Sequence, residues 1–138
     1  DEGTVNAHIA RHKTFRKMFD AYPEGEVGKH AITHYKVIER YNYTTLVSCV
    51  LETGRTHQIR VHMTHVGHGL LGDPTYGGRR KLPAKALSEV GLEAAKTFNR
   101  QALHAAVLGF EHPISGELLR FEADLPDDIA VLLQKLRT

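Results

Sequence analysis

Hydrogen-bonding side chains are concentrated in one short segment, residues 51–63, around the predicted start of a helix. Free backbone N–H groups and the helix dipole favour an anion at such a position. An arginine one turn into the helix, Arg60, could hold a phosphate or a carboxylate through its bidentate guanidinium. The alternative is a solvated helix start with ordinary capping, so the functional interpretation requires Arg60 to point into a cleft. The candidate side chains are Arg55, Thr56, His57, Gln58 and Arg60.

Four histidines near this helix raise a second possibility, a metal site in a hydrolase. His62, His65 and His68 are spaced by three residues, and His57 precedes them; zinc sites use such spacings. However, Gly67 should end the helix before His68, and no cysteine or glutamate completes a ligand set. The His-Glu-x-x-His pattern of zinc proteases is also absent. We therefore expect these histidines to serve in packing, capping or RNA contacts, with no bound metal.

The segment 70–78 is rich in turn-forming residues and contains the most tempting carboxylate, Asp73. In a Gly-Asp-Pro sequence an aspartate commonly accepts backbone N–H bonds that fix the turn, and we favour that role. Tyr76 could stack on a base, but we expect it to anchor the loop on the core. Further along, Leu103 could line a pocket or be an ordinary core residue, and His104 follows it.

The elements that must position these residues can be predicted from periodicity and turn residues. Strands are expected at 31–40 and 44–52, paired as a hairpin, and at 102–110 and 118–122. Helices are expected at 57–65, capped by Thr56, within 84–97, and after 125–128, where Ile129, Leu132, Leu133 and Leu136 form an apolar stripe. Residues 1–30 are expected to form an extended or loop-rich arm. This order favours an α+β fold in which helices flank a mixed or antiparallel sheet, and residues 1–138 show no composition break that would divide them.

Composition places weak limits on function. The net charge of +2 and the pI of about 8.8 fit RNA binding but also fit many other proteins. A single cysteine, Cys49, cannot form an internal disulfide, which argues for a reducing compartment and predicts a cytoplasmic protein. No apolar run approaches the ~20 residues that span a bilayer, and the N-terminus does not read as a signal peptide, so no membrane association is expected.

Four motifs in order resemble the RluA/RluD-type family of RNA pseudouridine synthases, and the D-type branch, which modifies large-subunit ribosomal RNA, is the most similar. The motifs are Leu51-Glu-Thr-Gly-Arg-Thr-His-Gln-Ile-Arg-Val-His-Met63, Leu70-Leu-Gly-Asp-Pro-Thr-Tyr-Gly-Gly78, Gln101-Ala-Leu-His-Ala105 and His112-Pro-Ile-Ser-Gly-Glu117. The resemblance implies isomerisation of uridine in RNA without a metal or an organic cofactor. It implies that Arg60 pairs with a nucleophilic aspartate and that Leu103 lines the uracil pocket. It further implies a flipped nucleotide, bound near Arg55, Thr56, His57, Gln58 and His104.

The chain departs from the family pattern because it contains no His-Arg-Leu-Asp-like segment to supply the nucleophile. We therefore expect residues 1–138 to be the C-terminal portion of one catalytic domain, inactive by itself. Sheet edges that are normally paired would be exposed, which predicts self-association. The role of Arg60 requires its guanidinium to face a hollow where an acid from elsewhere can dock, rather than an internal partner.

Basic residues suggest where RNA would be contacted, and they also support an alternative function. A non-catalytic RNA-binding module would use the same phosphate contacts and would lose affinity steeply with salt. The expected RNA-binding residues are Arg11, Lys13, Arg16, Lys17, Arg79 and Arg80, with Arg55 and Lys81 as further candidates.

Overall fold

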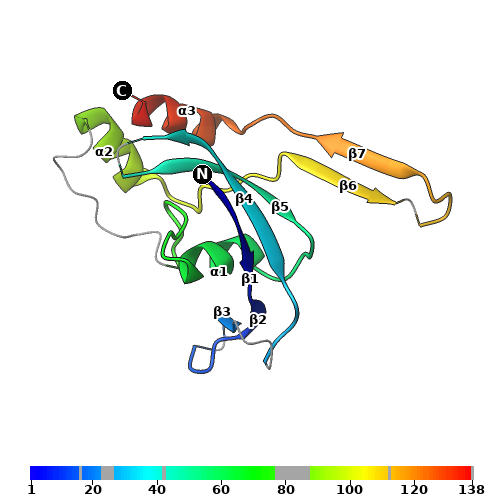
Figure 1. Cartoon of the computed structure of the whole chain (residues 1–138). Coiled ribbons are helices and arrows are strands. Elements are labelled where there is room, and N and C mark those ends of the chain that lie inside the picture. Colours follow the sequence, from blue (N-terminus) through cyan, green and yellow to red (C-terminus); the bar gives the residue numbers. More distant parts are fainter. Residues whose placement is uncertain (16, 23–26, 42, 77–87, 112, 138) are drawn as a thin grey trace.

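The computed structural model describes residues 1–15, 17–22, 27–41, 43–76, 88–111 and 113–137 (Figure 1). The elements in chain order are β1 (Glu2–Asn6), β2 (His8–Arg11), β3 (Phe19–Tyr22), β4 (Ile32–Arg40), β5 (Thr45–Leu51), α1 (Gln58–His65), α2 (Glu89–Thr97), β6 (Val107–Glu111), β7 (Leu118–Glu122) and α3 (Asp127–Leu136). The strand pairs among the described residues are all antiparallel and helices accompany them, so the predicted α+β class is confirmed. Within the described part of the chain, no helix is both long and apolar enough to cross a membrane.

The largest sheet has the order β1-β4-β5, with β4 in the centre. The predicted hairpin of β4 and β5 is confirmed, with Tyr35 opposite Cys49. The N-terminal stretch was expected to be an extended or loop-rich arm, and this expectation was incomplete because β1, β2 and β3 all lie within it. β1 pairs with β4 in a register that puts Gly3 opposite Tyr35. A Cβ on Gly3 would lie 2.5 Å from the Tyr35 hydroxyl, so glycine makes room for that ring.

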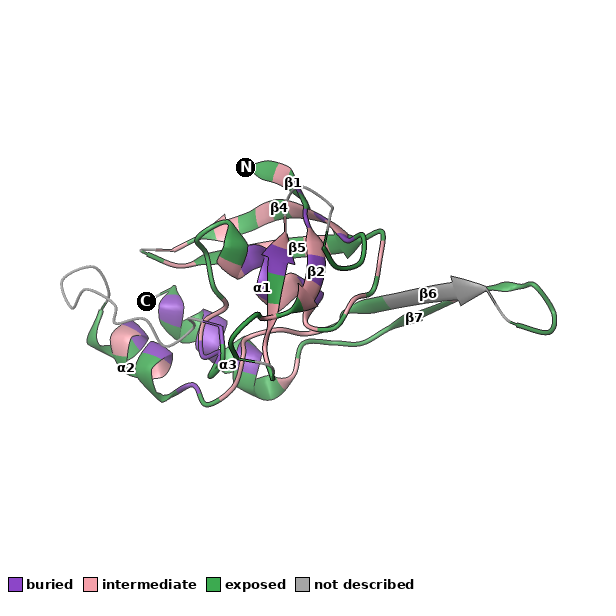
Figure 2. Cartoon of the chain, turned by 90° about the horizontal axis from the view of Figure 1, so that it is seen from below, coloured by how far each residue is buried: buried purple, intermediate pink, exposed green. Residues whose placement is uncertain are grey.

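Helix α1 packs against the sheet through its buried side, which includes Val61, His62 and Met63. One core cluster joins this helix to the small β2–β3 sheet and to the loop that follows α1; its buried members are Ala7, Ile9, Ala21, Ala31, Val61 and Tyr76. The His62 ring is fully buried, 2.8 Å from the Thr33 hydroxyl and 2.8 Å from the Ala7 carbonyl oxygen. These contacts attach α1 to two segments that precede it in the chain. Figure 2 shows α1 coloured largely as buried.

Helices α2 and α3 pack together and cover the end of the β4–β5 hairpin at which the two strands are connected (Figure 1). The predicted apolar stripe of the last helix is confirmed, since Ile129, Leu132, Leu133 and Leu136 are all buried, together with Phe98. Tyr41 and Leu46, at the ends of the hairpin strands, pack against this second cluster. Arg137 follows α3 and binds the Glu39 carboxylate on β4, with Nη2 2.9 Å from Oε1.

Strands β6 and β7 form a separate ribbon that extends away from the rest of the molecule (Figures 1 and 2). The predicted strand at 118–122 is confirmed, whereas the strand predicted at 102–110 begins only at Val107. Several apolar side chains of the ribbon and its turn are exposed, including Leu118 at 84%, Ile114 at 91% and Phe121 at 56%. Residues 101–106 therefore form a connection that runs from the helices to this ribbon.

Candidate functional site

Helix α1 begins at Gln58 after His57, whose φ of 54° is in the left-handed region. The expectation that Thr56 caps the helix is wrong, because the helix start has no side-chain cap and the cap position is His57. Gln58 organises this turn instead: its Oε1 accepts from the Arg55 N–H at 2.9 Å and from the Thr53 hydroxyl at 2.8 Å.

The amide nitrogen of Gln58 also forms hydrogen bonds within the protein. Its Nε2 lies 3.0 Å from both the Ile32 carbonyl and the Thr33 hydroxyl, and the residue is 3% exposed. Gln58 thus ties the start of α1 to β4. Both ends of its amide are used internally, so the structure gives the expected substrate-binding role of Gln58 no support.

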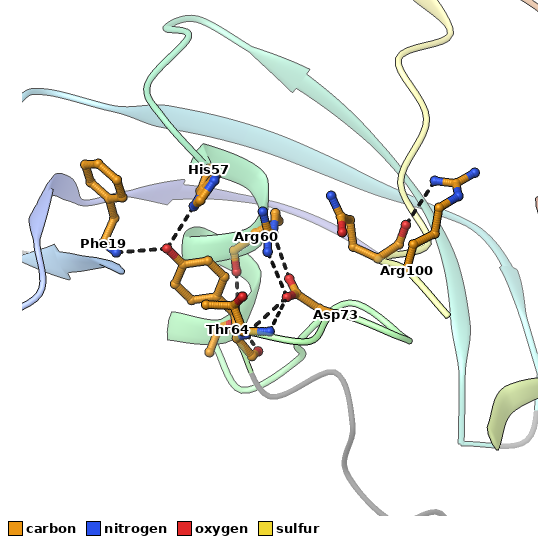
Figure 3. A network of polar contacts seen from close by, with 9 residues as sticks. Phe19, His57, Arg60, Thr64, Asp73 and Arg100 are labelled. Carbon is orange, nitrogen blue, oxygen red and sulfur yellow. Dashed lines mark hydrogen bonds and ion pairs between the residues drawn. The ribbon is translucent and has the colours of Figure 1, made fainter. Parts of the chain in front are cut away.

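Arg60 is bound by an internal acid. Its Nε donates to Asp73 Oδ2 at 2.8 Å and its Nη2 donates to Oδ1 at 2.9 Å (Figure 3). The side chains are 12% and 0% exposed. The expectation of a guanidinium that faces an open hollow rather than an internal partner is therefore wrong, because the loop after α1 returns Asp73 to the helix. Spacing along the sequence did not reveal this pair.

Asp73 also fixes its own turn, as predicted. Oδ1 accepts from the Thr75 N–H at 2.9 Å and from the Tyr76 N–H at 3.1 Å. Burial by itself would raise the pKa of Asp73, but hydrogen bonds from Arg60, Thr75 and Tyr76 outweigh it and hold the pKa below its ordinary value. The hydrogen bonds that Arg60 donates to Asp73 raise the pKa of Arg60. Both groups are therefore ionised at neutral pH.

Tyr76 anchors the loop on the core, as expected, and is 4% exposed. Its hydroxyl accepts from the Phe19 N–H at 2.8 Å and is hydrogen-bonded to His57 Nδ1 at 2.9 Å (Figure 3). The Arg60 Cζ lies 5.0 Å from the centre of the Tyr76 ring. Burial, and then the charge of Arg60, lower the pKa of His57, so its ring is neutral at neutral pH. His57 and Tyr76 thus belong to one polar network with Arg60 and Asp73.

The connection that carries Leu103 and His104 lies beside the loop of Asp73. The Ala102 N–H donates to the Leu71 carbonyl at 2.8 Å. A Cβ on Gly72, whose φ is +79°, would lie 2.1 Å from the Arg100 carbonyl oxygen, so only glycine allows this approach. The fold thereby brings the Leu103 segment to the loop that binds Arg60. His104 itself lies 3.1 Å from the Ala123 carbonyl, at the base of the β6–β7 ribbon.

The remaining predicted residues are distributed over a wider surface. Arg55 donates from Nε to the His30 carbonyl at 2.7 Å, and Thr56 is exposed. On the β2–β3 hairpin, the Arg11 guanidinium lies 5.3 Å from the Phe19 ring centre and the Lys13 amine lies 5.6 Å from that of Tyr22. Lys17 is exposed in the same hairpin. Arg16, Arg79, Arg80 and Lys81 lie outside the described residues.

Of the four histidines in and around α1, His62 and His57 are bound by protein atoms. Both ring nitrogens of His62 are hydrogen-bonded internally, and burial lowers its pKa. His57 is bound to Tyr76, while His65 and His68 are exposed. Across the described ranges, no group of three His, Cys, Asp or Glu residues is arranged to hold a metal ion.

The sequence of the chain is similar to those of known proteins. The model of the family described as RNA pseudouridylate synthase matches residues 1–65. The chain is 50% identical, over 135 residues, to ribosomal large subunit pseudouridine synthase D of Haemophilus influenzae. It is 48% identical, over 137 residues, to an uncharacterized RNA pseudouridine synthase of Bacillus subtilis. These matches cover 98% and 99% of this chain but 40% of each relative, so the chain spans about two fifths of their length.

Solved structures give the same result for the fold. The human RNA pseudouridylate synthase domain containing 4 aligns with a TM-score of 0.65 and 25% identity, covering 99% of this chain and 56% of that one. The human domain containing 1 aligns with a TM-score of 0.60 and 26% identity, covering 99% and 59%. These matches run through both core clusters and the helix that carries Arg60. Along nearly its whole length, the chain is thus similar to proteins named as RNA pseudouridine synthases, and the family model matches its first 65 residues.

Proposed function

We propose that this chain is the C-terminal portion of the catalytic domain of a pseudouridine synthase, contained in a longer polypeptide called the parent below. The parent would isomerise uridine to pseudouridine in RNA, with large-subunit ribosomal RNA as the substrate. The support is the 50% identity, over 98% of this chain, to a protein named ribosomal large subunit pseudouridine synthase D. Because the match covers 40% of that relative, we propose that the parent supplies the attacking acid from a segment outside these residues.

The observation that carries the proposal is the sequence identity to that relative. Because Arg60 is paired with an internal acid, it keeps the proposed role only through Nη1, the atom that Asp73 does not occupy. Asp73 occupies Nε and Nη2, and among the described residues no hydrogen bond reaches Nη1. A second carboxylate that approached Nη1 would be kept ionised and aimed by the guanidinium, in a largely buried setting that strengthens the attraction. The Arg60 side chain is 12% exposed, and we propose that the second carboxylate reaches Nη1 through this exposed part.

The reaction requires one glycosidic bond to be exchanged for another. The C1′–N1 bond of uridine breaks, the base turns, and a C1′–C5 bond forms; hydrogen leaves C5 and a proton is added at N1. An apolar wall would hold the uracil without competing for its polar edge, and Leu103 lies on the connection that adjoins the Asp73 loop. Arg55, Thr56 and His57 at the start of α1, and His104, would contact the flipped nucleotide or its phosphates.

Release of tritium from C5 tests this proposal. The probe is a large-subunit ribosomal RNA transcript labelled with [5-³H]uridine. We expect the parent to release tritium and the 138-residue chain alone to release none. Arg60→Ala in the parent should reduce the rate by at least ~100-fold, the scale for loss of an electrostatic partner of the reacting group, while RNA affinity stays within about twofold.

The matched control is Arg40→Ala, because Arg40 lies on β4 and forms an exposed ion pair with Asp1. This variant should keep the rate of the unmodified parent. Turnover by the 138-residue chain alone, or an Arg60→Ala parent that retains its rate, would contradict the proposal.

A non-catalytic RNA-binding module is the second candidate, and one observation favours it. The β2–β3 hairpin contains the cations Arg11, Lys13 and Lys17. Phe15, in the turn of this hairpin, is 62% exposed. Cations interleaved with an exposed ring suit a phosphate backbone and a stacked base. A parent that binds the transcript but releases no tritium would favour this module. In either case we place the protein in the cytoplasm, where the single thiol of Cys49 would remain reduced.

A further inference from the structure

We infer that Asp73 is a positioning residue for the reaction proposed above: it holds the Arg60 guanidinium in the one orientation from which Nη1 can meet the attacking acid. The inference rests on the proposed function, because it concerns the same site. Asp73 acts through Arg60 in this proposal and does not itself touch the nucleotide.

The first support is the geometry of the pair. Two parallel hydrogen bonds, of 2.8 and 2.9 Å, join the Nε–Nη2 edge of Arg60 to both oxygens of Asp73. Such a bidentate contact fixes the plane of the guanidinium as well as its distance. The ring of Tyr76 lies beside that plane, with its centre 5.0 Å from Cζ. Rotation of the guanidinium would break contacts with both neighbours, so Nη1 has a defined direction.

The second support is that Asp73 is itself immobilised. Oδ1 accepts the N–H groups of Thr75 and Tyr76, and Gly72 is packed against the Arg100 carbonyl. The Thr64 hydroxyl lies 2.7 Å from the Arg60 carbonyl and 2.9 Å from the Tyr76 carbonyl, so one shared donor ties the helix to the loop (Figure 3). The carboxylate therefore has a fixed position relative to the backbone of α1.

The third support is energetic. Transfer of an ion pair from water into the interior costs about as much as its attraction returns, so a buried pair is a poor source of stability. The same fold contains a pair of matching geometry at the surface: Arg100 binds Asp128 at 2.8 and 2.9 Å, with the two side chains 37% and 46% exposed. The exposed pair shows that an arginine and an aspartate can join two segments of this fold without being buried. Burial of Asp73 instead serves the orientation of Arg60.

The substitution Asp73→Asn distinguishes the role of Asp73 in its own turn from its role in orienting Arg60. The amide oxygen can replace Oδ1 and keep the bonds from Thr75 and Tyr76, whereas the amide nitrogen replaces Oδ2 and opposes the Nε–H of Arg60 as a second donor. In the parent we expect kcat for tritium release to fall on the order of 10- to 100-fold, the scale for a misplaced catalytic group. The KM for the labelled transcript should stay within about twofold. Asp128→Asn, at the surface pair, is the matched control and should leave both constants unchanged.

A double-mutant cycle with Arg60→Lys decides whether Asp73 acts through Arg60. Lysine cannot make the bidentate contact, so Asp73→Asn should cause no further loss of kcat in the Arg60→Lys background. Asp73→Asn could instead lower kcat by the same factor in the unmodified parent and in the Arg60→Lys parent, or lower kcat/KM only in proportion to the fraction of folded protein. Either result would show that Asp73 has only a structural role and would overturn the inference. A parent without tritium release would overturn the proposed function, and with it any positioning role in that reaction.

The orientation itself can be measured in the 138-residue chain, without activity. The Arg60 Nε–H should exchange slowly with solvent in a nitrogen-15 NMR spectrum, because it is buried and bonded to Asp73. Asp73→Asn should make it exchange at least ~10-fold faster, while Asp128→Asn should not change it. Unchanged protection in Asp73→Asn would show that Asp73 does not hold the guanidinium.

Discussion

At the scale of single residues, His62 shows how a buried polar group makes folding depend on pH. Its ring binds Thr33 and the Ala7 carbonyl and is 0% exposed. Burial lowers its pKa below the ordinary value of 6.5, so in the window just below 6.5 the unfolded chain binds more protons than the folded one. The stability that His62 contributes is therefore complete above that value and is lost as the pH falls through the window. His57 has a shift of the same sign.

We expect the free energy of unfolding to be smaller at about pH 5.5 than at about pH 7.5. Urea denaturation at the two pH values measures it. His62→Gln, which keeps one donor and one acceptor but does not titrate, should have a weaker pH dependence than the unmodified chain. His68→Gln, at an exposed position, should retain the full dependence. Equal stability at both pH values in the unmodified chain would contradict the prediction.

At the scale of elements, the β2–β3 hairpin is the best-defined candidate contact with RNA. Arg11 and Lys13 lie against aromatic rings on this hairpin, and Lys17 is exposed. Each phosphate contact releases condensed counterions, so it contributes ~0.7 to the slope of log affinity against log salt for single strands and ~0.9 for duplexes.

Replacement of Arg11, Lys13 and Lys17 together by alanine should reduce that slope by about two to three units. Binding of a labelled RNA transcript at several salt concentrations measures the slope. Lys36→Ala is the control, because Lys36 is exposed on β4 away from the hairpin. An unchanged slope in the triple variant would place the RNA surface elsewhere.

The elements that could be predicted from sequence are those with a strong local signal. Strands β4, β5 and β7 have β-branched or alternating residues between turns, and α3 has a complete apolar stripe. β1 was missed because it is short, contains Gly3, and becomes a strand only by pairing with β4, a contact between distant segments. Asp73 shows the same difference between local and distant contacts. Its turn-fixing role could be predicted from the local sequence Gly-Asp-Pro, whereas its contact with Arg60 depends on the path of the whole loop.

At the scale of the whole molecule, the β6–β7 ribbon is a two-stranded sheet with exposed apolar side chains. Such a hairpin is marginally stable by itself. No other described strand pairs with its edges, and open edges are templates for other strands. We therefore predict that the isolated 138-residue chain self-associates through this ribbon.

Sedimentation velocity over a range of concentrations should show dimers or larger species that dissociate on dilution. Leu118→Lys, at a side chain that is 84% exposed, should shift the chain toward monomer. Val90→Lys is the control, because Val90 is an apolar side chain on α2, far from the ribbon, with 48% exposure. A chain that sediments as a monomer at every concentration would contradict the prediction.

The contact between Arg137 and Glu39 has a consequence for biosynthesis. The two residues are separated by 98 positions, and the helix before Arg137 covers Tyr41 and Leu46 at the end of the β4–β5 hairpin. During translation the β4–β5 hairpin emerges from the ribosome long before α3 does, so this end of the sheet stays uncovered until α3 has emerged. A premature stop before α3 would thus release a product with a bare apolar surface, a target for chaperones and proteases.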